Sequence, residues 1–144
     1  MANQIDGPIA EITPQVLLKA YACGIFPMAE SAHDPVLYWI EPQQRGILPL
    51  GRMHVPRRLR RTVRSNHFDI RVDCDYEAVI VGCGASRAGR RSTWINAPIR
   101  NLYRELFTIG NCHTIETWRN DRLVGGLYGV HLGGAFFGES VFSL

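Results

Sequence analysis

Five arginines fall within one short stretch of the chain, HVPRRLRRTVRSNH at residues 54–67. Val55, Leu59 and Val63 recur at every fourth position, which predicts an amphipathic helix with a basic outer face. Several guanidinium groups on one face can bind phosphates, so an RNA such as tRNA would suit this helix. A solvated helix face is the alternative, although no interspersed glutamates support it. The candidate RNA-binding residues are Arg57, Arg58, Arg60, Arg61 and Arg64.

Glu139 is a lone carboxylate within the aromatic segment 136–142. Alternation along a strand places such a side chain either toward solvent or at the wall of a pocket. Burial would raise the pKa of an unpaired carboxyl, whereas a nearby ammonium or amine would stabilise its charge. At a pocket wall, Glu139 would therefore be suited to hold an amine.

Gly125, Gly126 and Gly129 interrupt a segment that otherwise reads as a strand. Glycine weakens a strand and permits the close approach of a ligand or of another backbone, but a bulge or a tight bend would explain it equally. Arg122-x-x-Gly125 begins a pattern like the phosphate loop of acyl-CoA-dependent N-acetyltransferases. Leu127 and the strand that follows do not fit that loop, so binding of phosphate at a helix terminus is not predicted.

Several other kinds of site are excluded by residue spacing. Cys23, Cys74, Cys83 and Cys112 form no C-x-x-C pair, which predicts buried or partly buried free thiols and no metal site. The sequence contains no Ser-His-Asp arrangement, no Walker loop and no paired carboxylates of catalytic spacing. Of the three tryptophans, Trp39, Trp94 and Trp118, most are expected to lie in the core.

The composition is that of one globular unit, or of one unit with a small appendage. Of the 144 residues, 46% are apolar and 20% are charged, and the net charge of +3 is too small to indicate nucleic acid by itself. No apolar run approaches the roughly 20 residues that cross a bilayer, and the N-terminus does not resemble a signal peptide. A cytoplasmic location is the resulting expectation.

The elements that would position these residues form an α+β pattern with an antiparallel three-stranded meander. Thr13 and Pro14 begin a helix that should end before Gly24, and Asn96 begins a second helix that should end at Gly110. Prolines break the segments between the first helix and residue 42 into loops and short extended pieces. A strand is predicted at 68–72, a short helix at 76–81 capped by Asp73 or Asp75, a flexible basic loop at 82–91, and strands at 113–118, 123–130 and 135–142.

Several motifs occur in one order along nearly the whole chain: AYxxGIFP at 20–27, Tyr38-Trp39 and Pro42, TWI at 93–95, LVGGLYGV at 123–130 and FGESVFS at 137–143. Together they resemble the leucyl/phenylalanyl-tRNA-protein transferase family. The resemblance implies a bacterial enzyme that transfers leucine, phenylalanine or sometimes methionine from aminoacyl-tRNA to an N-terminal arginine or lysine. The modified protein would then be degraded through the ClpS/ClpAP N-degron route, and the reaction needs neither coenzyme A nor another cofactor.

The resemblance also implies a domain division and a set of roles. Residues 1–53 would form a small N-terminal lobe, and residues 54–144 would form the first part of an N-acetyltransferase-like (GNAT-like) domain. Trp94, Leu127 and Phe136 fall where the family binds the aminoacyl-adenosine, and Tyr21 is a further aromatic substrate-binding position. Glu139 would be catalytic, by orienting an amine or by taking a proton. The arginine helix would grip the tRNA acceptor stem and deliver it to a cleft between the glycine strand and the strand of Glu139.

One departure from the family bears on activity. Relatives continue past the segment that matches residues 137–143, and they add helices and a further strand. We therefore expect the isolated chain to have little or no transferase activity, and the strand at 135–142 to present an open apolar edge. The alternatives are a non-catalytic tRNA-binding fragment, an acyl-CoA N-acetyltransferase, and an incompletely folded fragment.

Overall fold

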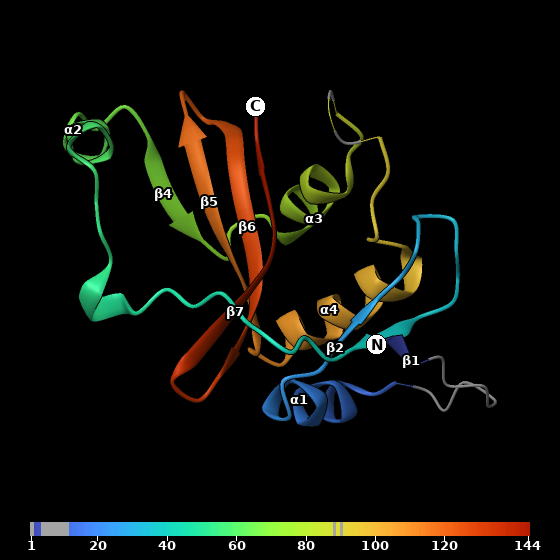
Figure 1. The fold of residues 1–144 in the computed structure, drawn as a ribbon. Coiled ribbons are helices and arrows are strands. Elements are labelled where there is room, and N and C mark those ends of the chain that lie inside the picture. Colours follow the sequence, from blue (N-terminus) through green and yellow to red (C-terminus); the bar gives the residue numbers. More distant parts are fainter. Residues whose placement is uncertain (1, 4–11, 88, 90) are drawn as a thin grey trace.

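The larger of two antiparallel sheets organises the molecule (Figure 1). The computed structural model describes residues 2–3, 12–87, 89 and 91–144. Four strands follow the order β4-β5-β6-β7, where β4 is Asp69–Val72, β5 is Cys112–Arg119, β6 is Arg122–Leu132 and β7 is Ala135–Ser143. The predicted α+β class and the three-stranded meander are confirmed, and β4 joins the meander beside β5. β7 forms the other edge of this sheet, as expected for the strand at 135–142.

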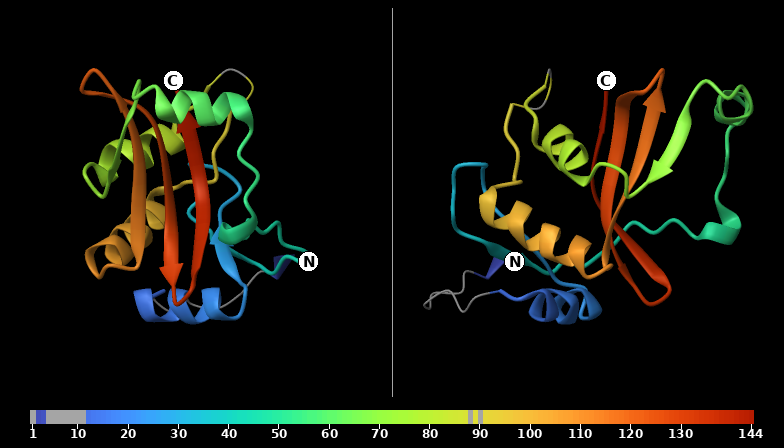
Figure 2. Two further views of the ribbon diagram at one scale, coloured as in Figure 1. Left: turned by 90° about the vertical axis from the view of Figure 1, so that its left-hand side faces the viewer. Right: turned by 180° about the vertical axis from the view of Figure 1, so that it is seen from behind.

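Three helices cover one face of this sheet, which we call the inner face. They are α1 (Pro14–Ala22), α3 (Tyr76–Gly84) and α4 (Ala97–Thr108), and they contact β5, β6 and β7 (Figures 1 and 2). The core between helices and sheet contains Leu17, Ile99, Leu106 and Val130, all of which are fully buried. Burial of this apolar surface is the main force that holds the helices on the sheet.

Side-chain caps begin all three of these helices. Thr13 Oγ1 accepts from the backbone N–H of Val16 at 3.3 Å, and Asn96 Oδ1 accepts from that of Ile99 at 2.9 Å. Asp75, and not Asp73, caps α3. The helix α3 runs to Gly84, so the predicted basic loop begins later than residue 82; residues 88 and 90 of that loop lie outside the described part. Within this helix Gly82 lies against the ring of Phe142, which a Cβ atom would meet at 2.6 Å, so the position requires a glycine.

A small second sheet lies in the N-terminal part of the chain. Its strands are β1 (Ala2–Asn3), β2 (Phe26–Met28) and β3 (Tyr38–Ile40), in the order β1-β3-β2. β2 and β3 are the short extended pieces that the prolines predicted. Asn96 Nδ2 donates to the carbonyl oxygen of Asp34 at 2.7 Å, which ties the loop between β2 and β3 to the start of α4.

The predicted arginine helix is present as α2 (Arg57–Arg64), but its apolar stripe is not covered. Leu59 is 49% exposed and Val63 is 67% exposed, and α2 buries none of its residues. The expectation of an inward-facing apolar side is therefore wrong for this structure. The short helix η1 (Leu50–Arg52) and its flanking loops carry α2 away from the core, over the outer face of the sheet (Figure 2, left).

A β-bulge interrupts the pairing of β6 with β7. Tyr128 pairs with Ser140 and Gly129 pairs with Gly138, so Glu139 has no partner across the ladder. A bulge places two residues of one strand opposite one residue of its neighbour and redirects the side chain of the extra residue. Glu139 is that extra residue, and its orientation does not follow the simple alternation of the strand.

The cysteines and tryptophans are placed only partly as predicted. All four cysteines are free; Cys83 and Cys112 are buried, whereas Cys23 and Cys74 are exposed, contrary to expectation. The two exposed thiols lie just after α1 and just before α3, at helix ends that the core does not reach. Trp39 and Trp94 pack against the core while remaining partly exposed. None of the described helices is long and apolar enough to span a membrane.

The Gly129 position should tolerate no side chain. A Cβ atom there would lie 2.5 Å from Cζ of Phe136 and would clash with the carbonyl oxygen of Phe137, which is backbone and cannot move aside. We expect Gly129→Ala to lower the free energy of unfolding by about 3 kcal/mol, measured by urea denaturation. Gly134→Ala is the control, because nothing lies within 4 Å of its Cβ position. Equal stability of the two variants would contradict the register at the bulge.

Candidate functional site

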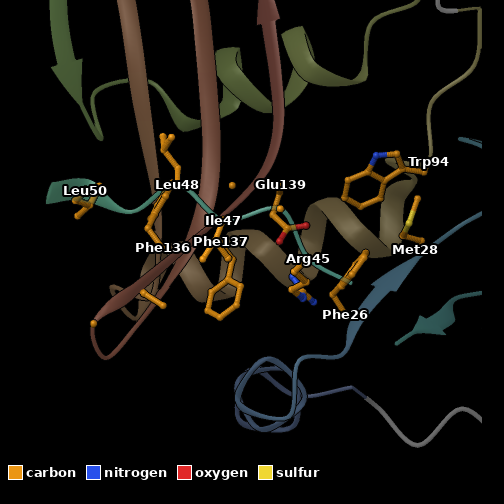
Figure 3. Close-up of a pocket in the computed structure, with 14 residues that line it drawn as sticks. Phe26, Met28, Arg45, Ile47, Leu48, Leu50, Trp94, Phe136, Phe137 and Glu139 are labelled. Atoms are coloured by element: carbon orange, nitrogen blue, oxygen red, sulfur yellow. The ribbon is translucent and has the colours of Figure 1, made fainter. Parts of the chain in front are cut away.

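A pocket of about 610 Å³ lies beside the first half of β7 (Figure 3). Its walls come from four separate parts of the chain: β2, the segment 45–50, the loop before α4, and the hairpin end of β7. Most of the lining side chains are apolar or aromatic, and one carboxylate and one guanidinium are placed among them. The principal lining residues are Phe26, Met28, Arg45, Leu48, Trp94, Phe136, Phe137 and Glu139.

Glu139 binds two tyrosine hydroxyls at the inner side of this pocket. Tyr21 donates to Glu139 Oε1 at 2.5 Å, and Tyr103 donates to Oε2 at 3.4 Å. The two hydroxyl oxygens are themselves 2.5 Å apart, so all three groups form one network. Of the two outcomes left open by the sequence, a solvent-facing Glu139 is wrong, and a position at the wall of a pocket is confirmed.

Each member of this network is positioned by a different element. Tyr21 lies on the buried side of α1, and Tyr103 is fully buried on α4. The bulge in β7 directs Glu139 between them, while Phe137, two residues earlier, packs against the ring of Tyr21 with centroids 5.1 Å apart. Three elements therefore fix the carboxylate, and the site is preorganised by their packing.

Burial changes the acid–base properties of the network. Burial raises the pKa of Glu139 above its ordinary value, and the hydrogen bonds from Tyr21 and Tyr103 and the nearby charge of Arg45 lower it in part. Burial, together with the Glu139 carboxylate, raises the pKa of both tyrosine hydroxyls. Both tyrosines therefore remain protonated donors at neutral pH, and the carboxylate is the group that can exchange a proton or bind a cation.

Arg45 supplies the positive charge of the pocket. Its guanidinium lies 5.1 Å from the ring centroid of Phe26 and 5.7 Å from that of Phe137, and it donates to the carbonyl oxygen of Gly24 at 2.7 Å (Figure 3). The two rings and the carbonyl hold the guanidinium at the wall of the pocket that Glu139 also lines. No pattern in the sequence points to Arg45, because a single arginine in a proline- and glycine-rich loop has no informative spacing.

The raised pKa of Glu139 predicts a pH-dependent effect on stability. The folded chain binds this proton more tightly than the unfolded chain, so the contribution of Glu139 to stability falls as pH rises from about 4.5 through the folded pKa. Glu139→Gln removes that penalty. The stability of Glu139→Gln relative to the unchanged chain should therefore increase with pH over this window and level off above it.

Urea denaturation at a series of pH values measures this difference. Glu105→Gln is the matched control, since Glu105 is an exposed glutamate of α4. A difference curve for Glu139→Gln that coincides with that of the control would show that Glu139 does not titrate as the buried member of the network.

The structure brings together most of the predicted site residues, but not all of them. Trp94, Phe136 and Glu139 line one pocket, and Tyr21 lies directly behind Glu139. Leu127 lies elsewhere, in a hollow on the outer face with Ile115 and Val141. Tyr103 is a further member of the site that no motif in the sequence indicates; the available signal is that a buried tyrosine needs a partner for its hydroxyl.

The five arginines of α2 lie outside the pocket but are joined to it by a short segment. Leu50 lines the pocket, and Arg57 begins α2 seven residues later, so the two backbones are at most roughly 25 Å apart. All five arginines are exposed, and no carboxylate in the described part of the chain pairs with them. They remain available for an anionic partner that also reaches the pocket.

Metal ligands are not grouped in the part of the chain that the structure describes. No three histidine, cysteine, aspartate or glutamate side chains there are close enough together to hold an ion. Glu116, the most deeply buried carboxylate, instead accepts backbone N–H groups of Cys74 and Asp75 and the indole N–H of Trp118. Its hydrogen bonds are structural, and Glu139 is the carboxylate that faces a pocket.

Comparisons with known proteins agree over nearly the whole chain. A family model described as leucyl/phenylalanyl-tRNA protein transferase matches residues 47–144, and one described as the N-terminal domain of that transferase matches residues 10–43. A curated leucyl/phenylalanyl-tRNA–protein transferase of Afipia carboxidovorans is 61% identical over 137 residues, which are 95% of this chain and 60% of the relative.

Two further curated proteins with the same name are similar to a comparable degree. The protein of Rhodopseudomonas palustris strain BisB18 is 59% identical over 137 residues, which are 95% of this chain and 60% of that protein. The protein of Nitrobacter winogradskyi is 59% identical over 133 residues, which are 92% of this chain and 59% of that protein. The chain thus spans about 60% of the length of the curated relatives that it matches.

Proposed function

The chain belongs to the leucyl/phenylalanyl-tRNA protein transferase family, and we propose that it acts in the transfer of leucine or phenylalanine from aminoacyl-tRNA to the N-terminus of an acceptor protein. The acceptor residue is arginine or lysine, and methionine is a less frequent donor. We place this reaction in the cytoplasm, where aminoacyl-tRNA is available, and its product in the ClpS/ClpAP N-degron route.

The proposal includes the arrangement of the family site on this fold. Residues 1–53 form the N-terminal lobe, and residues 54–144 form part of a GNAT-like domain whose sheet carries Glu139. The observation that supports this function best is the hydrogen-bonded Glu139 carboxylate in the wall of an apolar pocket. Such a pocket can receive a leucine or phenylalanine side chain while its carboxylate binds the α-amino group of the same residue.

The protein needs to supply little chemical activation, because the ester of an aminoacyl-tRNA is already activated. The acceptor amine attacks the ester carbonyl and the bond to the ribose oxygen breaks. The amine loses one proton as the peptide bond forms, and the leaving ribose oxygen gains one to become a hydroxyl. The main contribution of the protein is to hold the two reactants in attacking geometry. Glu139 orients one of the two amines. If the reaction uses a general base, Glu139 also accepts the proton of that amine.

Trp94, Phe136 and Tyr21 complete the substrate site, with Leu127 as a further member proposed from the family pattern. Arginines 57, 58, 60, 61 and 64 hold the acceptor stem of the tRNA. No cofactor and no metal takes part in this proposal. The first consequence is that the chain should distinguish aminoacyl-tRNAs by the amino acid as well as by the RNA.

The test is a comparison of affinities for phenylalanyl-tRNA, deacylated tRNA and aspartyl-tRNA at one salt concentration. We expect phenylalanyl-tRNA to bind at least about tenfold more tightly than the other two, since a buried apolar side chain contributes about 1.5–3 kcal/mol. Transfer of labelled phenylalanine to an arginine-starting peptide, with a glutamate-starting peptide as control, then measures the reaction itself.

A second candidate function is tRNA binding without catalysis. It is favoured by the exposed arginines of α2, which need no part of the pocket to bind RNA. Salt-dependent binding of all three RNAs with equal affinity would support this function and exclude the first.

A further inference from the structure

One stretch of the chain, residues 42–68, concentrates the positive charge of the molecule. It contains seven of the 16 Lys and Arg residues and none of the 13 Asp and Glu residues. The nine basic residues elsewhere are outnumbered by these acidic ones, so the rest of the chain is net negative. A surface on which charges of one sign gather attracts a partner of the opposite charge. Five of the seven arginines lie on α2, and the other two, Arg45 and Arg52, precede it.

Arg52 lies between the pocket and α2. Arg45 lines the pocket at one end of this connecting segment, and Arg57 begins α2 at the other end. Arg52 is the last residue of η1, seven residues after Arg45 and five residues before Arg57. Figure 1 shows the segment running from the region of β2 through η1 to α2. The arginines therefore connect the pocket to the arginine helix along one continuous piece of backbone.

The connecting segment lies on the surface of the molecule. Every residue from 43 to 54 is exposed, and the Arg52 side chain has no carboxylate partner among the described residues. Pro49 and Pro56 restrict the backbone, and Pro49 and Met53, on either side of η1, have extended φ and ψ angles. The segment therefore presents its charges outward along a stiff path.

We propose that this segment binds the unpaired 3′ end of the tRNA, and that Arg52 contacts a phosphate between the stem on α2 and the terminal nucleotide in the pocket. A single strand has one row of phosphates, which fits cations that are spread singly along an extended segment. A duplex fits α2 better, because five guanidinium groups gather there on one short helix. The pocket of about 610 Å³ has the size of a small-molecule site, so a single-stranded end can enter it and a duplex cannot.

An acidic peptide would also be attracted to this charge, but it fits the end of the path less well. The path ends at the pocket that contains the Glu139 carboxylate, which repels a chain of carboxylates. An RNA that carries an esterified amino acid ends instead in an ammonium group, which Glu139 attracts. The site is cationic along the segment and has a carboxylate at its end, and this order of charges is complementary to that of an aminoacyl-tRNA.

This proposal rests on the proposed function, because it takes α2 as the element that holds the stem and the pocket as the end of the path. Its test uses deacylated tRNA, so that recognition of the amino acid plays no part. The two probes are the complete tRNA and the same tRNA shortened by its unpaired 3′ nucleotides. We expect the unchanged chain to bind the complete tRNA at least about tenfold more tightly at low salt, with a steeper salt dependence.

Arg52→Ala should lower the affinity for the complete tRNA by roughly three- to tenfold and the salt slope by about one, because one phosphate contact is lost. Its affinity for the shortened tRNA should not change. Arg52→Lys keeps the charge, so it should retain the salt slope. Binding titrations over a series of salt concentrations measure both quantities.

Arg104→Ala is the control for this substitution. It removes one exposed arginine on α4, so it should leave the ratio of the two affinities unchanged. Arg52 is exposed and forms no ion pair among the described residues, so the melting temperature of Arg52→Ala should match that of the unchanged chain. A change in RNA binding then reports on the contact and not on the fold.

Three results would overturn the proposal. The first is equal affinity of the unchanged chain for the complete and the shortened tRNA. The second is a loss of affinity in Arg52→Ala that is the same for both RNAs. The third is binding of polyglutamate that Arg52→Ala weakens as much as it weakens binding of the complete tRNA, which would indicate an acidic peptide as the partner. Failure of the proposed function gives a different pattern, in which phenylalanyl-tRNA is not preferred while Arg52→Ala still distinguishes the two deacylated RNAs.

Discussion

Replacing the five arginines of α2 by alanine should lower the affinity of the chain for tRNA by at least about 100-fold at low salt. All five are exposed and have no carboxylate partner among the described residues, so their charge is free to pair with phosphates. With each phosphate contact that is lost, fewer counterions are released when the tRNA binds. The slope of log affinity against log salt concentration should therefore become less steep by roughly four, which a series of binding titrations measures.

Arg100 and Arg104 provide the control for this experiment. Both lie on α4 and pair with Glu77, with nitrogen–oxygen distances of 3.7 Å and 2.5 Å. Their replacement by alanine changes the net charge without touching α2, so both the affinity for tRNA and the salt slope should change little. A loss of affinity that followed net charge alone, irrespective of position, would refute the assignment of α2 as the RNA-binding element.

Glu139→Gln should weaken the binding of a non-hydrolysable phenylalanyl-adenosine amide by roughly 10- to 100-fold. The carboxylate is held by Tyr21 and Tyr103, so it can accept from an ammonium without first being reoriented. Glutamine keeps the shape and one acceptor oxygen, but it replaces the other oxygen by an N–H donor and lacks the charge. Calorimetric titration of the unchanged chain and of the variant measures the difference.

A ligand without the α-amino group separates this interaction from a general loss of the pocket. The unchanged chain and Glu139→Gln should bind this des-amino ligand with equal affinity, because the partner of the carboxylate is missing in both cases. An equal loss for the two ligands would instead show that the substitution disturbs the pocket, and that Glu139 does not contact the amine.

Much of the fold could be predicted from local sequence signals. Thr13-Pro14 and Asn96-Ala97-Pro98 specify helix starts by hydrogen bonds within one turn, and Gly24 and Gly110 adopt the positive φ angles that end these helices. The hairpins after Arg119 and Leu132 are equally local, because their turn residues determine the pairing of neighbouring strands. These elements depend on residues that are only a few positions apart.

The site could be predicted only in part because its contacts are distant in sequence. Glu139 and Tyr21 are 118 positions apart, and neither spacing nor periodicity relates them. The bulge that directs Glu139 inward depends on the register between β6 and β7, and alternation along β7 alone left its orientation open. The role of Arg45 depends on two aromatic rings from different strands. The residues next to Arg45 in the sequence do not indicate this role.

The side chain of Asn96 has a consequence for recombining this protein with its relatives. It caps α4 through one atom and holds the carbonyl oxygen of Asp34 through another, while α4 also carries Tyr103 to the hydroxyl of Tyr21. Residues 10–43 and residues 47–144, which match separate family models, are therefore joined by hydrogen bonds within one core. A chimera that took residues 10–43 from a distant relative would leave Tyr103 without this partner unless the relative also had a tyrosine at position 21, and Asn96 without its partner unless the relative's loop placed a backbone carbonyl where that of Asp34 lies.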